Sequence, residues 1–175
     1  QQADLMAQFH TQFTARSIGF DTGGPDIRLK SFSSTFLWHL FTRAQELGIE
    51  FVGQGIVGQV RIGERATVTL TLAKDSGDLH VVPTVAVDGR MVPVTDTHPP
   101  LPVGNVGFAL TSLDTSGRLP HVDIALAPTD KPLAPPVREL FGRQDPLVVP
   151  PEDIAEFYEQ TVPVVRSVIP IDAAD

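Results

Sequence analysis

Residues 66–93 decide the fold, and they read ATVTLTLAKDSGDLHVVPTVAVDGRMVP. In the first part of this stretch apolar side chains alternate with threonines, a period of two that is typical of a strand with one buried face. Residues 75–78 are turn formers, and Asp88-Gly89 between two apolar runs predicts a two-residue hairpin. We therefore expect an antiparallel meander over roughly residues 49–94.

Two helices are predicted before the meander. Residues 3–16 carry apolar side chains three and four positions apart, the pattern of an amphipathic helix. A second stripe of the same kind follows Ser33 or Ser34, either of which can cap a helix, and it ends at Gly48. This second segment is the better defined of the two.

Short elements separated by prolines are predicted after the meander. Strands are expected over 106–113, 122–127 and 168–171. A helix is expected from Pro135 or Pro136 to Phe141, because a proline in the first turn sacrifices no helical hydrogen bond. The same pattern at Pro151 predicts another helix, with Ile154, Phe157 and Tyr158 on its apolar face.

Together these elements predict an α+β fold with a mixed, largely antiparallel sheet and peripheral helices. Fifteen of the sixteen prolines fall from Pro83 onward, so the character of the chain changes near its middle. We expect one accessory domain over residues 1–175. A division into a helix pair plus meander over 1–94 and a proline-rich, acidic α/β segment over 95–175 remains open.

Charge and composition limit the function classes. The net charge is −8, and residues 83–175 alone carry six basic and thirteen acidic side chains, a balance of −7. Direct nucleic-acid binding by this segment is disfavoured, because it requires clustered Lys and Arg; it stays open only if the scattered Arg28, Lys30 and Arg43 converge in the fold. There is no cysteine, no secretion signal and no apolar run of membrane-spanning length, so we expect a cytoplasmic chain without membrane contact.

The two ends of the sequence suggest an excerpt. The chain begins with Gln1-Gln2 instead of an initiating methionine, and it stops at Asp175 without a helix-ending signal or a charged tail. We therefore expect these residues to be a segment of a larger protein.

Candidate metal ligands are present, but their spacing is poor. His121 and Asp123 share one face of a predicted strand, and Asp96 lies near His98 in a proline-containing loop. A catalytic metal normally has three protein ligands, and no His-x-x-x-His or similar pairing completes this set. Solvated turn and strand-edge positions explain these residues better.

Other catalytic patterns fail on context. Gly53, Gly55 and Gly58 match a Gly-x-Gly-x-x-Gly string, but a strand pattern follows where a dinucleotide loop needs a helix. The remaining candidates are isolated histidines, serines outside any nucleophile motif, and acids on a predicted solvated helix face: His10, His39, His80, Ser31, Ser33, Ser34, Glu152, Asp153, Glu156 and Glu159. We expect no catalytic, cofactor-binding or metal-binding residue in this segment.

Four stretches nevertheless carry a resemblance to a known family. They are VGFAL at 106–110, IALAP at 124–128 with Pro132-Leu133, LVVPPEDIAEF at 147–157, and VPVVRSVIPID at 162–172. From about residue 76 onward their order resembles the helicase-associated region that precedes the motor in bacterial SWI/SNF-type ATPases. Residues 1–75 match this pattern less well.

The resemblance implies a non-catalytic accessory or regulatory region. The parent protein would be a DNA-dependent ATPase or helicase that binds ATP and magnesium in its motor, outside these residues. The partner implied is that motor, within the same polypeptide, or another protein. Two alternatives stay open: a free-standing protein-interaction or assembly module, and a metal-dependent enzyme built around His98, His121 and Asp123.

Overall fold

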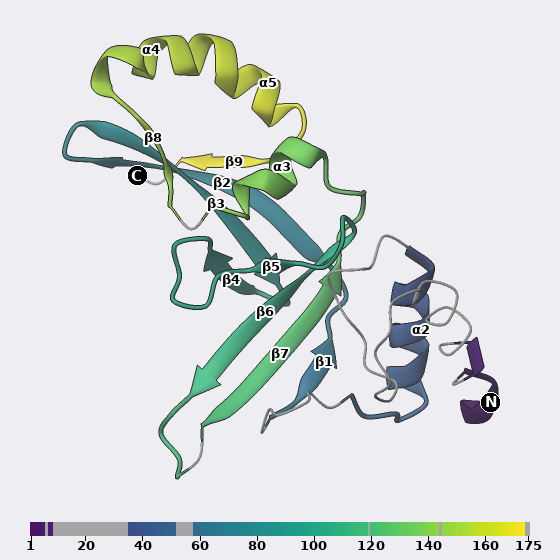
Figure 1. Ribbon diagram of the computed structural model, residues 1–175. Helices are drawn as coiled ribbons and strands as arrows, with labels where there is room; N and C mark the ends of the chain where they lie inside the picture. The colour runs from purple at the N-terminus through teal and green to yellow at the C-terminus, as the bar shows by residue number, and fades with distance from the viewer. Residues whose placement is uncertain (6, 9–34, 52–57, 119, 144, 174–175) are drawn as a thin grey trace, which may run out of the picture.

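Figure 1 shows the protein as a computed structural model, in which helices surround two β-sheets. The expected α+β class, with mixed and largely antiparallel sheets, is confirmed. The strands are arranged in two sheets, where the sequence pattern predicted one. The structure describes residues 1–5, 7–8, 35–51, 58–118, 120–143 and 145–173.

The larger sheet, sheet B, contains the expected meander. Strands β2 (Ala66–Asp75), β3 (Asp78–Val87) and β4 (Arg90–Pro93) are antiparallel neighbours. Both connections are two-residue turns with positive φ: 54° and 102° at Ser76-Gly77, and 49° and 82° at Asp88-Gly89. These angles match the hairpin turn that the Asp-Gly pair predicts, because its backbone twist suits the flanking strands.

Later parts of the chain add two strands to sheet B. Strand β8 (Leu147–Val149) pairs antiparallel with β3, and β9 (Ile171–Ala173) pairs parallel with β2. The final strand was expected over 168–171, which is wrong by three residues. The chain is still turning at Val168 and Ile169, whose N–H groups both donate to the carbonyl of Val165.

The smaller sheet, sheet A, has the strand order β1-β7-β6-β5. Its members are β1 (Val60–Ile62), β5 (Leu101–Pro102), β6 (Gly107–Asp114) and β7 (His121–Pro128). Strand β1 was expected in the meander, but it pairs parallel with β7, with Val60 opposite Ile124. This parallel pairing joins residues more than sixty positions apart, which a local alternation pattern cannot reveal.

The helices lie at the periphery, as predicted. Of the two helices predicted before the meander, the second and better defined is α2 (Thr35–Glu46), whereas the first, over residues 3–16, lies mostly outside the described residues. Helix α3 (Pro135–Leu140) begins at the expected proline. We call residues 151–166 the C-terminal helical segment. It comprises η2 (Pro151–Asp153), α4 (Ile154–Glu156), the π-helical turn η3 (Phe157–Thr161) and α5 (Val162–Arg166).

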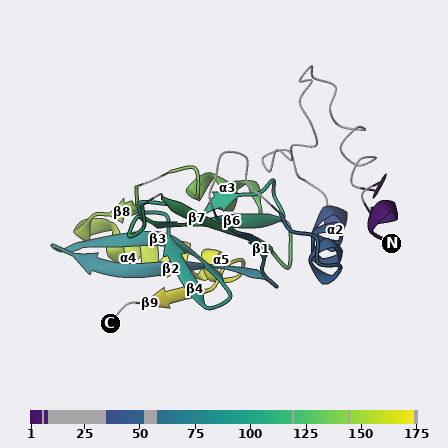
Figure 2. The same cartoon turned by 90° about the horizontal axis from the view of Figure 1, so that it is seen from below.

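The main core lies between the two sheets, which form separate layers in Figure 2. From sheet A, Phe108 and Leu110 are fully buried there, and from sheet B so are Val85 and Val87. Each such side chain contributes about 1.5–3 kcal/mol through loss of contact with water. Helix α3 closes one side, where Phe141 meets Phe108 edge-on at a ring-centroid distance of 4.8 Å.

A second core lies on the opposite face of sheet A. Ala109 and Leu126 alternate with the residues of the main core, so they point the other way, toward α2. There the Trp38 ring lies directly over Gly107: a Cβ atom at Gly107 would come within 2.2 Å of the ring and 2.6 Å of the carbonyl oxygen of Ala127. Only glycine permits this approach.

The C-terminal helical segment covers the far end of sheet B (Figure 1). Its buried or half-buried positions are Ile154, Phe157, Val162 and Val165, and the step from Phe157 to Val162 is five residues. At that step the N–H of Val162 donates to the carbonyl of Phe157, the hydrogen bond of a π turn. Pro163 follows at once and has no N–H to offer the preceding turn, a common cause of such irregularity.

Both halves of the chain contribute to both sheets. Strand β1 from the first half pairs with β7, and the last strand, β9, pairs with β2. Between the sheets, an Arg90 side-chain nitrogen donates to the carbonyl oxygen of Thr111 at 2.9 Å. The division of residues 1–175 at position 94 stays a prediction, and these pairings cross that position.

The contact between Trp38 and Gly107 is testable by substitution. Gly107→Ala forces the ring and the neighbouring strand apart, and we expect the free energy of unfolding to fall by about 1–3 kcal/mol. Gly142→Ala is the matched control, because its new Cβ meets only the carbonyl of Glu139, at 3.3 Å. Urea unfolding of both variants measures the difference. Equal losses would contradict this account of the packing.

Candidate functional site

The polar residues predicted on β7 do meet. The Nε2 atom of His121 lies 3.0 Å from Oδ1 of Asp123, and both side chains are about half exposed. The same Oδ1 accepts a hydrogen bond from the backbone N–H of Gln59 at 2.9 Å. Asp123 therefore connects the start of β7 to the residue just before β1.

The surroundings of Asp123 and Asp114 favour the charged form of both carboxyl groups. The pKa of Asp123 lies below its ordinary value of 3.8, mainly because the Gln59 N–H donates to it; partial burial opposes the shift, and the charges of His121 and Arg61 assist it. The pKa of Asp114, which faces His121 across the strands, is also lowered, mainly by hydrogen bonds from Ser116. Both acids are built to stay ionised.

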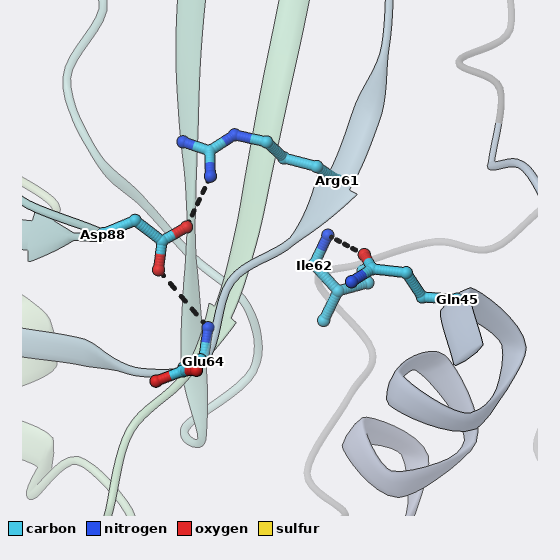
Figure 3. Close-up of polar contacts among 5 residues, drawn as sticks. All are labelled: Gln45, Arg61, Ile62, Glu64 and Asp88. Atoms are coloured by element: carbon cyan, nitrogen blue, oxygen red, sulfur yellow. Dashed lines mark hydrogen bonds and ion pairs between the residues drawn. The ribbon is translucent and has the colours of Figure 1, made fainter.

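A second group of polar contacts joins the two sheets at the start of the meander (Figure 3). Arg61 on β1 forms an ion pair with Asp88 in the β3–β4 turn, and Asp88 also accepts the N–H of Glu64 at 3.4 Å. Nearby, Oε1 of Gln45 on α2 accepts the N–H of Ile62 at 2.9 Å. These contacts hold α2, sheet A and the hairpin turn together.

The third residue of the metal hypothesis does not join the first two. The N–H of His98 donates to Oδ1 of Asp96 at 2.8 Å, within the loop before β5. Among the described residues, no three His, Asp or Glu side chains gather closely enough to hold a metal ion.

The Gly-x-Gly-x-x-Gly string has only its last glycine in the described part of the chain; Gly53 and Gly55 lie outside it. A Cβ atom at Gly58 would lie 1.8 Å from the carbonyl oxygen of Val122. The glycine therefore allows the chain to run against the backbone of β7.

The other predicted positions are dispersed. His39 is exposed on α2, next to the buried Trp38, and His80 is half-buried on β3. Arg43 is paired with Glu46 at 2.7 Å on the exposed side of α2. Several further candidates lie outside the described residues: His10, Ser31, Ser33, Ser34, Arg28 and Lys30.

The acids of the C-terminal helical segment all point to solvent. Glu152, Asp153, Glu156 and Glu159 are exposed, as expected for a solvated helix face. Tyr158 was expected on the apolar face, but it is 41% exposed, because the π turn rotates it away from the core between Phe157 and Val162. That expectation is corrected.

Sequence reasoning missed two exposed apolar side chains in the same region. Val164 is 66% exposed and Val168 is 64% exposed. Their hydrophobicity suggested burial, and the only available signal was Pro163, which marks a change of helical register. They lie on the outside because the five-residue step at η3 shifts the buried stripe to Val162 and Val165.

The polar contacts around Arg61 and Asp123 are chemically suited to holding strands in place, and the outer surface of the C-terminal helical segment is suited to contact. No helix in the described part of the chain is long and apolar enough to cross a membrane. Comparison with protein-family models, with curated proteins and with solved structures found no match.

Two substitutions at Asp88 separate the effect of its backbone conformation on stability from the effect of its charge. Asp88→Ala places alanine at a φ of 49° and removes both acceptor contacts, so we expect a loss of about 1–2 kcal/mol in unfolding free energy. Asp88→Asn retains a residue that tolerates this conformation and loses only the charge, for about 1 kcal/mol or less. Urea unfolding distinguishes the two. An asparagine variant as unstable as the alanine variant would contradict the backbone explanation.

Asp123 makes the stability of the fold depend on pH in the acid range. Its folded pKa is below 3.8, so its contribution is present above the unfolded pKa and is lost as the pH falls through the folded value. Between about pH 5 and pH 2 we expect Asp123→Asn to lose stability less steeply than the wild type. Urea midpoints across this range measure the slopes, and identical slopes would show that the hydrogen bond from Gln59 does not favour the carboxylate.

Proposed function

We propose that this chain is a non-catalytic accessory region of a bacterial SWI/SNF-type DNA-dependent ATPase, acting in the cytoplasm. The motor, with its ATP and magnesium, belongs to the rest of the parent polypeptide. In this proposal the region docks on the motor and restrains it, and it contacts neither nucleic acid nor membrane.

One observation carries the proposal: each of the four resembling stretches places apolar side chains in the main core, while Val106, Ala109 and Leu126 belong to the second core. The main-core side chains come from β6, β7, β8, the C-terminal helical segment and β9, and their shared cluster contains Phe108, Leu110, Ala125, Ala127, Val149, Ile154, Phe157, Val162, Val165, Ile169 and Ile171. Stretches that are up to sixty residues apart in sequence thus serve one structural unit.

The charge distribution supports docking on a basic surface. The half of the chain from residue 83 onward carries −7, and its acids in the C-terminal helical segment are exposed. A DNA-translocating motor has a basic path for the phosphate backbone. An acidic region seated near that path would compete with DNA and weaken its binding at low salt.

Deleting residues 1–175 from the parent protein tests the function. The open reading frame should first show a Gly-x-x-x-x-Gly-Lys-Ser/Thr motif and an Asp-Glu-x-His motif downstream of Asp175. We expect the truncated protein to bind DNA more tightly, with a steeper salt dependence, and to hydrolyse ATP faster without DNA. Filter binding across a salt series and steady-state ATPase rates measure these effects. Unchanged rate, affinity and salt slope would refute the proposal.

A further inference from the structure

The outer side of the C-terminal helical segment has no partner among the described residues. Its inner side packs in the main core through Ile154, Phe157, Val162 and Val165. Its outer side carries two valines that are about two-thirds exposed, Val164 and Val168. Large apolar side chains grouped on a surface are typical of contact sites.

Exposed acids lie on the same segment as these valines. Val164 lies in α5, and Val168 follows four residues later in the turn that ends the segment. Glu152, Glu156 and Glu159 are exposed on the same segment, before and within the π turn. We call Glu152, Glu156, Glu159, Val164 and Val168 the acidic–apolar stripe.

The net charge of residues 151–168, which carry the stripe, selects the partner. Residues 151–168 contain four acidic side chains and one basic side chain, Arg166, a balance of −3. A nucleic acid or an anionic lipid surface would be repelled. A protein surface with Lys or Arg around an apolar centre would complement both the charge and the valines.

We propose that the acidic–apolar stripe is a docking surface for a basic, amphipathic protein surface, with Val164 and Val168 as its apolar centre and the glutamates at its rim. The inference rests on the proposed function for the identity of that surface, which would be part of the ATPase motor. It goes further by naming the residues that make the contact.

The first experiment uses peptides as defined probes and does not require the motor. The full 175-residue chain, labelled with nitrogen-15, is titrated with an amphipathic Lys/Leu helix peptide and, separately, with a Glu/Leu peptide of the same length and pattern. We expect the Lys/Leu peptide to shift amide signals of residues 152–168, and the Glu/Leu peptide to leave them in place. Equal response to both peptides, or shifts confined to other elements, overturns the proposal.

Variants separate the centre of the stripe from its rim. Val164→Ser with Val168→Ser should weaken Lys/Leu binding about tenfold or more, because a contact centre dominates affinity. Glu156→Lys with Glu159→Lys should also weaken it and should flatten its salt dependence. Met91→Ser is the matched control for the valines: Met91 is 57% exposed on β4, in another part of the surface, and should have no effect. Undiminished binding by the valine variant contradicts the proposal.

Two further results decide what covers the stripe. If the wild-type chain dimerises in light scattering and the valine variant is a monomer, a second copy covers the stripe and the basic-partner proposal is wrong. One outcome in the parent protein is that the deletion of residues 1–175 changes the ATPase rate and DNA affinity while the valine variant leaves both unchanged. That result would support the proposed function and refute the stripe as the docking surface. The opposite result is that the peptide binds as expected but the deletion changes neither the ATPase rate nor DNA affinity. That result would support the docking surface and refute the proposed function.

Discussion

The structure depends on the burial of β6 and β7 on both faces. Phe108 and Leu110 fill the space between the two sheets, while Ala109 points to the other side and packs under α2. A strand buried on both faces has no position for a charged side chain, which is why residues 106–110 are uniformly apolar or glycine. Removing either layer would expose half of this central sheet to water.

This double burial also sets the size of the neighbouring side chains. The layers approach closely because Ala125 and Ala127 face the main core from β7 and Gly107 lies under the Trp38 ring. Polar contacts at the edges of these layers connect them further. Arg61 with Asp88 connects the sheets, and Asp123 with the Gln59 N–H connects β7 to the approach of β1. Arg61, Asp88 and Asp123 therefore serve to position strands.

The chemistry available on the surface is that of contact. Exposed carboxylates remain charged in water and attract basic groups, and exposed valines gain free energy when another surface covers them. Both features occur on the C-terminal helical segment, whose inner side is anchored in the same core as the two sheets. This outer surface is the feature on which the proposed docking rests.

The sequence by itself determined the elements whose signals are local. The alternation in β2 and β3, the Asp88-Gly89 turn and the apolar stripe of α2 all act between residues close along the chain, so the pattern predicted them. The proximity of His121 to Asp123 was predictable for the same reason, since alternate residues of a strand share a face.

Only the tertiary structure decided which distant segments meet. The parallel pairing of β1 with β7 gave Asp123 its partner at Gln59, and the division into two sheets placed Arg61 against Asp88. The π turn before Pro163 put Val164 outside the core. These outcomes depend on the free energy of packing whole layers together, and that quantity is not encoded in the periodicity of any single segment.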